Sequence, residues 1–450
     1  MKRYYDPIIF NQSLDGIDLK RHLIGTYYVE DEVPGDDFID HFSLIQSLVI
    51  EGSTGTWEEI KEESPEVRKR LTGKVVGYYE VPSDGKTKKA VIQLAFPIDA
   101  WNGNVSMILL SLAGNCYAYS PKMRLLDIFF PEDLVKMFKG PKFGISGVRK
   151  ILGIKKRPLS LHIIKPKMGM TPEQVANQVY QTALGGVDMC KDDEMTSDVY
   201  NSKFEDRIGA VMQALRKAEK KTGKKVIYFV SITDDVSKMV EKAKKAVKLG
   251  ANGLLMAYSA GPSILRTLAE DPEINVPLFM HPSHMIALVP RISVPALCKL
   301  CRLCGADLML TPTYWSSIPL VSYEEGIRSA QVLLAPFFHI KRTWPMPAAG
   351  MYPGLIPILV GEFGPDIIIP AGGGMLGHPM GYTAGARAWQ QAIEAAMNDV
   401  SLKEAAQDKP ELKAALEKWG TITRPKVLWL RAAPKYHPQP MNFDKPGSDS

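Results

Sequence analysis

The chain has 450 residues, 45% of them hydrophobic and 23% charged, and its formal net charge is +6. This length allows two or three domains that each bury a core, and the composition is that of an ordinary globular protein. Most basic residues fall on predicted helices, as in the stretches 216–225 and 238–248, where they indicate solvated faces rather than a nucleic-acid surface. A modest positive field instead suits a small anionic, phosphorylated substrate.

The N-terminus, the lengths of the apolar stretches and the cysteines indicate the cellular compartment of the protein. The N-terminus is polar and no apolar stretch reaches transmembrane length, so we expect no signal peptide and no membrane anchor. Five cysteines are an odd number in a long chain, which fits reduced thiols. We therefore expect a cytoplasmic protein.

Residues 1–135 mix strand-like and helix-like segments. The apolar runs 90–96 and 105–112 are typical of strands, and the segment from about 34 to 50 is typical of a helix. This mixture predicts an N-terminal α/β domain.

From about residue 155, short apolar runs alternate with amphipathic helical stretches eight times. Eight such repeats predict a (β/α)₈ barrel over residues 136–424, with its active site at the carboxyl ends of the strands. Residues 425–450 form a proline-rich polar tail, interpreted as an arm or a poorly ordered segment. The predicted barrel strands are 160–166, 187–194, 226–233, 253–258, 278–282, 307–312, 343–349 and 366–372.

The first barrel helix has clear boundary signals. Thr171 is a predicted N-cap with Pro172 at the first helical position, and Gly185 and Gly186 end the helix. Residues 383–397 predict another helix.

A Cys-x-x-Cys-x-x-Cys spacing occurs at Cys298, Cys301 and Cys304. It is compatible with a metal or an iron–sulfur cluster. The surrounding stretch has a helical pattern, however, and three thiols spaced three apart drift around one helix face, so we expect helix packing.

The run from Gly185 to Glu194 ends a predicted buried strand with a lysine and three acids. Burying such a cluster costs free energy unless a cation or counter-charge compensates the acids. Mg²⁺ is a suitable cation because it prefers oxygen ligands. Alternation directs Lys191, Asp193 and Glu194 toward the barrel mouth and Asp192 away from it. The two carboxylates would bind Mg²⁺ if the neighbouring lysine lost its positive charge, for instance as a carbamate formed with CO₂. The alternative is a salt-bridged strand end without metal.

Other chemically active residues also fall at predicted strand ends. Lys165 and Lys167 follow the first strand, where a lysine among cations and apolar walls can act as an acid or base; the alternative is two surface lysines. His281, at the end of the fifth strand, is a candidate for catalysis or substrate binding.

Glycines follow the seventh and eighth strands. Gly372, Gly373 and the residues after them predict a backbone cradle for phosphate, which Gly350 completes, while His378 orders the loop. The polar loop Glu51–Trp57 indicates only a turn by itself.

Taken together, these segments resemble the large subunit of RuBisCO, in order and over nearly the whole chain. The resemblance implies a ferredoxin-like α+β N-terminal domain followed by a (β/α)₈ TIM barrel. It also implies homodimers, or assemblies of dimers, in which the N-terminal domain completes the neighbour's active site. The matching segments are Lys165-Pro-Lys167-x-Gly169, Gly185–Glu194, Gly372-Gly-Gly-x-Leu-Gly-His-Pro379, Ser53-Thr-Gly-Thr-Trp57 and Gly114-Asn115.

The resemblance also implies a role for each matching residue. Lys191 corresponds to the carbamylated lysine, with Asp193 and Glu194 as the other Mg²⁺ ligands. Lys165 corresponds to the lysine that handles the enolisation proton, and Lys167 to its partner. His281 matches an active-site histidine. One phosphate site corresponds to Thr56, Trp57, Gly350, Gly372 and Gly373, and the neighbouring chain would supply Glu51 and Asn115.

Several positions depart from the carboxylase pattern. Pro282, Leu310 and Ala348 stand where carboxylases have an arginine, a histidine and a serine for the second phosphate of a bisphosphate. No lysine occurs between Lys299 and Lys341, although a lysine on the loop after the sixth strand steers CO₂ addition in carboxylases.

These departures indicate a RuBisCO-like protein rather than a carboxylase. The expected activity is Mg²⁺-dependent enolisation or isomerisation of a singly phosphorylated keto sugar or diketone, as in methionine salvage. Tyr314 and Trp315 would cover an apolar group of the substrate, such as methylthio. The alternatives are a decarboxylase of a phosphorylated 3-oxo sugar acid, a true ribulose-bisphosphate carboxylase and a non-catalytic regulatory protein.

Overall fold

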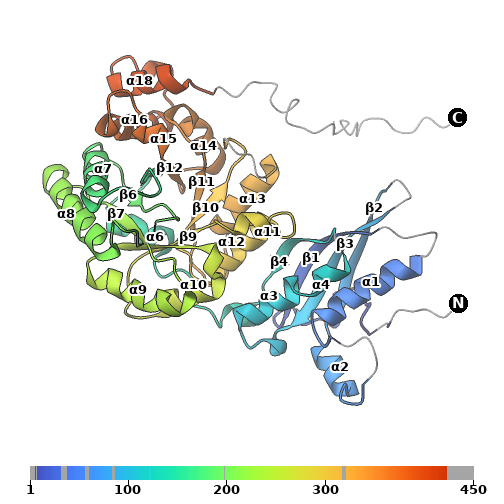
Figure 1. The fold of residues 1–450 in the computed structure, drawn as a ribbon. Helices are drawn as coiled ribbons and strands as arrows, with labels where there is room; N and C mark the ends of the chain where they lie inside the picture. The colour runs from blue at the N-terminus through green and yellow to red at the C-terminus, as the bar shows by residue number, and fades with distance from the viewer. Residues whose placement is uncertain are drawn as a thin grey trace, which may run out of the picture.

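The computed structural model describes residues 6, 8–31, 38–55, 60–83, 87–120, 122–196, 198–316 and 321–422. It consists of a smaller N-terminal α/β domain beside a larger barrel domain (Figure 1). Within these residues, no helix has the length and apolar character needed to cross a membrane. The predicted tail, residues 425–450, lies outside the described part.

The N-terminal domain is a four-stranded antiparallel sheet in the order β2-β3-β1-β4. This order, with helices joining β1 to β2 and β3 to β4, is the ferredoxin-like arrangement expected from the resemblance. Side chains from the helices and from one sheet face share a core. The elements are β1 (His22–Asp31), α1 (Phe38–Glu51), α2 (Pro65–Leu71), β2 (Lys74–Val81), β3 (Lys88–Pro97), α3 (Val105–Ala113), α4 (Cys116–Tyr119) and β4 (Arg124–Phe129).

One predicted strand of this domain is wrong, because residues 105–112 form helix α3. The side chain of Asn104 caps the helix by accepting hydrogen bonds from the backbone N–H groups of Ser106 and Met107. The buried residues Val105, Ile108 and Leu112 follow helical spacing. The predicted helix at 34–50 is α1, which begins at Phe38; residues 32–37 lie outside the described part.

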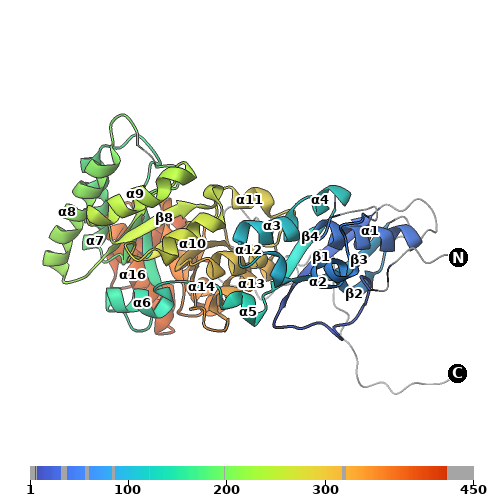
Figure 2. The same ribbon diagram turned by 90° about the horizontal axis from the view of Figure 1, so that it is seen from below.

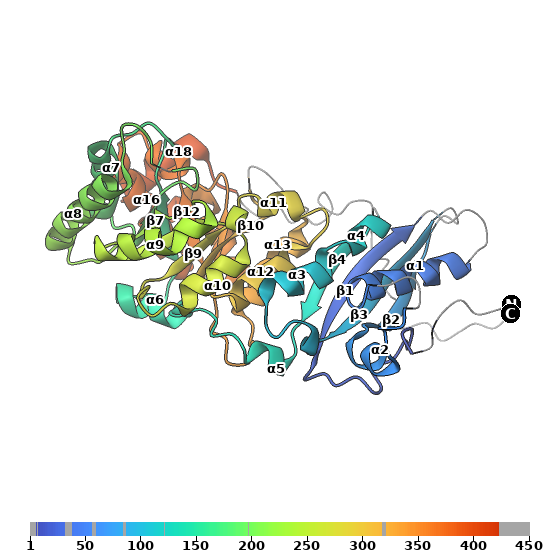
Figure 3. The same ribbon diagram turned by 60° about the horizontal axis from the view of Figure 1, so that its bottom comes forward.

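Strand β4 attaches the N-terminal domain to the barrel (Figure 3). The guanidinium of Arg124 donates to both carboxylate oxygens of Glu325 at 2.8 and 3.1 Å. Leu125 also donates its backbone N–H to the carbonyl oxygen of Arg291 at 2.9 Å. After β4, α5 (Glu132–Val135) and α6 (Gly144–Leu152) lead the chain to the base of the barrel.

The second domain is a parallel eight-stranded sheet in the order β11-β10-β9-β8-β7-β6-β5-β12. Strands β11 and β12 lie against each other, so the sheet curls into a near-closed barrel. All eight predicted strand positions are confirmed. The strands are β5 (Leu159–Ile163), β6 (Met189–Lys191), β7 (Ile227–Ser231), β8 (Gly253–Ala257), β9 (Leu278–His281), β10 (Leu308–Pro312), β11 (Trp344–Ala348) and β12 (Ile368–Ala371).

Helices surround this barrel (Figures 1 and 2). The predicted cap of the first one is confirmed, since Thr171 and Gln174 form a reciprocal capping box with Pro172 in the first turn. The helices are α7 (Pro172–Leu184), α8 (Phe204–Thr222), α9 (Val236–Lys248), α10 (Pro262–Glu270), α11 (Met285–Leu288), α12 (Val294–Leu303), α13 (Tyr323–Leu334), α14 (Ile356–Phe363), α15 (Gly373–Leu376), α16 (Tyr382–Met397), α17 (Leu402–Ala405) and α18 (Pro410–Trp419).

Apolar side chains fill the inside of the barrel. Leu161, Phe229, Phe279 and Trp344, from four of the strands, belong to one buried cluster, which α6 closes from below through Ile145. The interior is therefore a packed core and not a channel, which leaves the strand ends as the place for chemistry.

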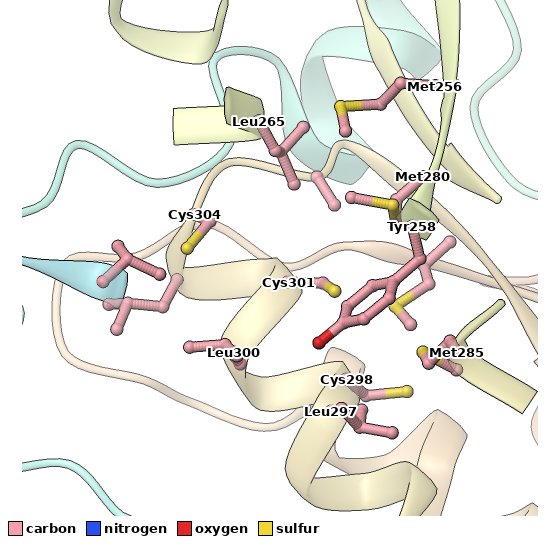
Figure 4. Packing of buried hydrophobic residues seen from close by; sticks show 14 of the residues in the cluster. Met256, Tyr258, Leu265, Met280, Met285, Leu297, Cys298, Leu300, Cys301 and Cys304 are labelled. Atoms are coloured by element: carbon pink, nitrogen blue, oxygen red, sulfur yellow. The ribbon is translucent and has the colours of Figure 1, made fainter. Parts of the chain in front are cut away.

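The three cysteines of the Cys-x-x-Cys-x-x-Cys stretch lie on α12 and just after it, and all are buried. Figure 4 shows Cys298 and Cys301 on the side of Tyr258 and Met285, whereas Cys304 lies at the far end of the helix. Burial raises the pKa of each thiol. The expectation of helix packing is confirmed: these thiols serve as core side chains.

Arg302, on the same helix, should contribute strongly to stability. Its side chain is 1% exposed, and its guanidinium donates to four backbone carbonyl oxygens between residues 332 and 341 at 2.8–3.1 Å. Replacing Arg302 with methionine leaves those carbonyls without partners, so we expect a loss of about 3 kcal/mol in chemical denaturation. The control Arg342→Met, on a half-exposed side chain, should change stability by less than about 0.5 kcal/mol; equal losses in the two variants would contradict this role.

Candidate active site at the barrel mouth

The site forms where the neighbouring parallel strands β5 and β6 end. Ile163 of β5 pairs with Lys191 of β6, and the next residue, Ile164, donates its backbone N–H to the carbonyl oxygen of Lys191 at 3.1 Å. This register brings the lysines that follow β5 beside the acids that follow β6.

Three ion pairs join these segments. Nζ of Lys165 lies 2.5 Å from Oδ2 of Asp193, whose side chain is fully buried. Nζ of Lys167 lies 3.1 Å from Oε1 of Glu194 and 3.7 Å from Oδ1 of Asp193. Burial lowers the pKa of the Lys167 ammonium, but its hydrogen bond to Glu194 and the nearby negative charges raise it overall. Lys167 therefore remains a cation.

Lys191 is a fully buried lysine at the centre of the cluster. Its Nζ donates to the carbonyl oxygen of Asp192 at 3.0 Å, lies 3.5 Å from Oε2 of Glu194 and sits 5.9 Å from the centre of the Phe279 ring. Burial lowers the pKa of Lys191, and the charges of Glu194 and Asp193 only partly oppose this shift. A lysine of this kind is prone to the neutral, nucleophilic amine form.

Glu194 links this lysine to His281. Burial raises the pKa of Glu194, but Lys191, a backbone hydrogen bond and Lys167 together bring it down to about 2. Nε2 of His281 lies 3.3 Å from Oε2 of Glu194. Burial, followed by the charge of Lys191, holds the pKa of His281 well below its usual value. Because its Nδ1 accepts the backbone N–H of Ser283 at 3.2 Å, the neutral ring carries its proton on Nε2, the nitrogen nearer to Glu194.

Asp192 points away from this cluster, as the alternation predicts. Its buried carboxylate accepts hydrogen bonds from the Tyr228 hydroxyl at 2.5 Å, the Ser231 backbone N–H at 3.0 Å and Nε of Arg207 at 3.4 Å. These contacts fix the backbone between Lys191 and Asp193. Arg207 and Tyr228 were not identified from the sequence. The only signal for them was strand alternation, which directs the Asp192 side chain away from the barrel mouth and so requires partners on that side.

The donor set fits a magnesium ion only when Lys191 takes part. Asp193 and Glu194 provide carboxylate oxygens, which Mg²⁺ prefers. Among the residues that the structure describes, no three His, Cys, Asp or Glu side chains converge as a metal site. A third anionic ligand would therefore come from Lys191, whose buried amine is suited to form a carbamate with CO₂.

The glycine loops after β11 and β12 lie against each other and beside Lys165. A Cβ on Gly374 would fall 2.0 Å from the carbonyl oxygen of Met351, which shows how closely the two backbones approach. A Cβ on Gly372 would lie 3.4 Å from Cγ of Lys165. Gly350 has a φ of +70°, which favours glycine. The glycines predicted to form a phosphate cradle thus lie on two adjoining loops, with Gly372 beside Lys165.

His378 stabilises the loop after this cradle. Its Nε2 lies 2.9 Å from the carbonyl oxygen of Glu411, and its Nδ1 accepts the backbone N–H of Met380 at 3.1 Å. These contacts suit the predicted ordering role.

Two predicted residues, Glu51 and Asn115, are not at this mouth within one chain. Glu51 ends α1, where its carboxylate accepts the Tyr119 hydroxyl at 3.2 Å, and the exposed Asn115 precedes α4. Figure 1 shows α1 and α4 on the N-terminal domain, apart from β6 and β12. Thr56 and Trp57 lie outside the described residues.

A ferredoxin-like domain, a near-closed parallel barrel and a lysine–carboxylate cluster at adjacent strand ends define a two-domain α/β-barrel protein with a charged site at the barrel mouth. The chain belongs to the ribulose bisphosphate carboxylase large chain family. The model of that family's catalytic domain matches residues 144–419, and the model of its N-terminal domain matches residues 15–134.

Similar proteins in this family carry different names. The chain is 40% identical over 396 residues to a ribulose bisphosphate carboxylase-like protein of Archaeoglobus fulgidus, covering 85% of this chain and 89% of that protein. It is 34% identical over 414 residues to a 2,3-diketo-5-methylthiopentyl-1-phosphate enolase of Geobacillus thermodenitrificans, covering 89% and 98%. The solved structure of an octameric ribulose-1,5-bisphosphate carboxylase/oxygenase from Pyrococcus horikoshii superimposes with a TM-score of 0.83 at 32% identity, covering 90% and 96%.

Proposed function

We propose that this protein is a RuBisCO-like enzyme that catalyses Mg²⁺-dependent enolisation of a singly phosphorylated keto sugar or diketone, as in methionine salvage. The observation that carries the proposal is a contrast within one barrel mouth. The lysine–carboxylate cluster at the ends of β5 and β6 is complete, whereas Pro282 follows β9, Leu310 lies within β10 and Ala348 ends β11. The similarity to a diketo-methylthiopentyl-phosphate enolase supports this reading.

Apolar surroundings at β10 and β11 argue against a second phosphate site. Leu310 packs against the apolar cluster that fills the barrel, and Ala348 is 4% exposed. Neither side chain can donate a hydrogen bond to a phosphate. The segment 300–340 also lacks the lysine expected of a carboxylase.

The chemistry follows from the charges around the cluster. Asp193, Glu194 and the Lys191 carbamate would hold Mg²⁺, which when bound supplies Lewis-acid polarisation of the substrate carbonyl. In its neutral amine form, Lys165 would take the proton from the carbon beside that carbonyl onto Nζ and return a solvent-derived proton. The cationic Lys167 would stabilise the negative charge that develops on the enolate oxygen. The cradle of Gly350, Gly372 and Gly373 would hold the single phosphate.

Two further parts complete the proposed site. A second copy of the chain would supply Glu51 and Asn115, since within one chain these residues lie apart from the mouth; the Pyrococcus horikoshii relative is octameric. The loop after β10 would cover an apolar substrate group with Tyr314 and Trp315. Their rings pack edge to face at 5.5 Å, and the Trp315 indole N–H donates to Glu362 of α14 at 2.9 Å.

Solvent deuterium exchange tests the substrate class. Protein, Mg²⁺ and bicarbonate are incubated in D₂O with a panel of singly phosphorylated ketoses and diketones and with ribulose bisphosphate, and the carbon-bound protons are followed by NMR. We expect exchange in one or more of the single phosphates and no fixation of ¹⁴CO₂ into ribulose bisphosphate. Robust fixation would establish a carboxylase instead. Loss of CO₂ from a phosphorylated 3-oxo sugar acid without exchange across the panel would favour a decarboxylase.

A further inference from the structure

A buried hydrogen-bond chain runs from α7 to the backbone of Lys165. Its members are Gln178 and Thr182 of α7 and His162 of β5, and their exposed fractions are 4%, 0% and 0%. None of them belongs to the lysine–carboxylate cluster.

Gln178 holds the backbone of Lys165 from both sides. Lys165 donates its backbone N–H to Oε1 of Gln178 at 3.2 Å, and Nε2 of Gln178 donates to the carbonyl oxygen of Lys165 at 2.8 Å. Lys165 lies two residues beyond the end of β5 at Ile163, so the amide of Gln178 replaces the pairing that a neighbouring strand would give. The direction in which the Lys165 side chain leaves the strand end is therefore set from α7.

The hydrogen-bond chain admits one arrangement of protons. A backbone N–H can only donate and a carbonyl can only accept, so the two bonds to Lys165 fix which end of the Gln178 amide is oxygen. Nε2 of His162 lies 3.0 Å from that oxygen and must carry a proton. Nδ1 of His162 is then the acceptor, and the Thr182 hydroxyl, 3.0 Å away, donates to it. Burial lowers the pKa of His162 to about 4, which keeps the ring neutral as this arrangement requires.

The geometry points to Gln178 as a positioning residue for Lys165, held in its working orientation by His162 and Thr182. This inference rests on the proposed role of Lys165 in proton transfer. Proton transfer to a base that is displaced by a small distance is much slower, because the transfer requires the reacting atoms to lie within hydrogen-bond reach. Lys165 would otherwise be free to swing away from Asp193, which lies 2.5 Å from its Nζ.

The test compares Gln178→Met, which keeps the side-chain length but removes the amide, with Gln181→Leu on the same helix. Gln181 accepts a hydrogen bond from Thr383 and does not contact Lys165. In Gln178→Met we expect the kcat for deuterium exchange to fall roughly 10- to 100-fold while KM and Mg²⁺ affinity stay within about twofold. Gln181→Leu should leave all three unchanged. A Gln178→Met variant that loses thermal stability but keeps its kcat would overturn the inference.

A second readout does not depend on activity. Competitive labelling with trace acetic anhydride, followed by peptide mass spectrometry, reports the reactivity of Lys165 relative to Lys242 of α9 as an internal reference. We expect Lys165 to label several times faster in Gln178→Met than in the parent or in Gln181→Leu, because it is held less firmly against Asp193. Equal labelling in all three proteins would overturn the inference. A parent without exchange activity would refute the proposed function, and the labelling would still decide the positioning role.

Should Gln178→Met fail to fold, Thr182→Val serves as the second variant. It removes the hydroxyl that donates to Nδ1 of His162, whereas Gln178 keeps its own bonds to Lys165, so the expected fall in kcat is smaller, roughly two- to fivefold, with a parallel rise in Lys165 labelling. Unchanged kcat and labelling in a folded Thr182→Val protein would contradict the hydrogen-bond chain.

Discussion

Replacing Lys191 with methionine is expected to abolish Mg²⁺-dependent turnover. Among the described residues, the cluster lacks a third ready-made anionic ligand, so removal of the lysine leaves Asp193 and Glu194 as the only carboxylate ligands. Losing the metal's stabilisation of the enolate, about 4 kcal/mol, corresponds to about 10³-fold in rate. Exchange kinetics measure the loss, and calorimetry with ¹³C-bicarbonate NMR follows Mg²⁺ binding and carbamate formation.

The matched control for this variant is Lys242→Met. Lys242 has a side chain only 13% exposed and packs over the Phe204 ring at 5.1 Å, but it lies on α9 and does not contact the cluster. Its replacement should leave turnover unchanged. Full activity in Lys191→Met, with Mg²⁺ still required, would refute the proposed metal site.

Replacing Lys165 with methionine should separate proton transfer from metal binding. Its Nζ is the group proposed to carry the proton, so we expect exchange to fall by roughly 10²- to 10⁴-fold. The amine of Lys191 and both metal carboxylates remain, so Mg²⁺ affinity and carbamate formation should be retained. Exchange kinetics and calorimetry on the same preparation measure the two properties.

Loss of Mg²⁺ binding in Lys165→Met would show that Lys165 acts through Asp193, its ion-pair partner, rather than on the substrate. Exchange close to that of the parent would require another base.

The barrel was predictable because buried parallel strands appear in sequence as short apolar runs between helices with clear caps. The run 105–112 shows the limit of that rule. A short apolar segment suits a strand or a buried helix equally, and here the hydrogen bonds from Asn104 decide for the helix. An asparagine before an apolar run was the signal available in the sequence.

The cluster itself was predictable because its members follow directly after two strands that are neighbours in the barrel. Its supports were not. His162 and Gln178 are 16 residues apart, and they meet only because α7 packs back against β5. Such contacts depend on helix rotation and on side-chain direction, which a local pattern does not contain.

The most direct test of the proposed function is the metal dependence of enolisation in one compound. That compound is 2,3-diketo-5-methylthiopentyl 1-phosphate, the substrate named for the Geobacillus thermodenitrificans relative. Deuterium incorporation is measured by NMR with Mg²⁺ and bicarbonate, and again after removal of the metal with EDTA. We expect deuterium incorporation next to a carbonyl that stops on chelation and returns when Mg²⁺ is restored. Incorporation that continues at the same rate without metal would contradict Mg²⁺-dependent enolisation.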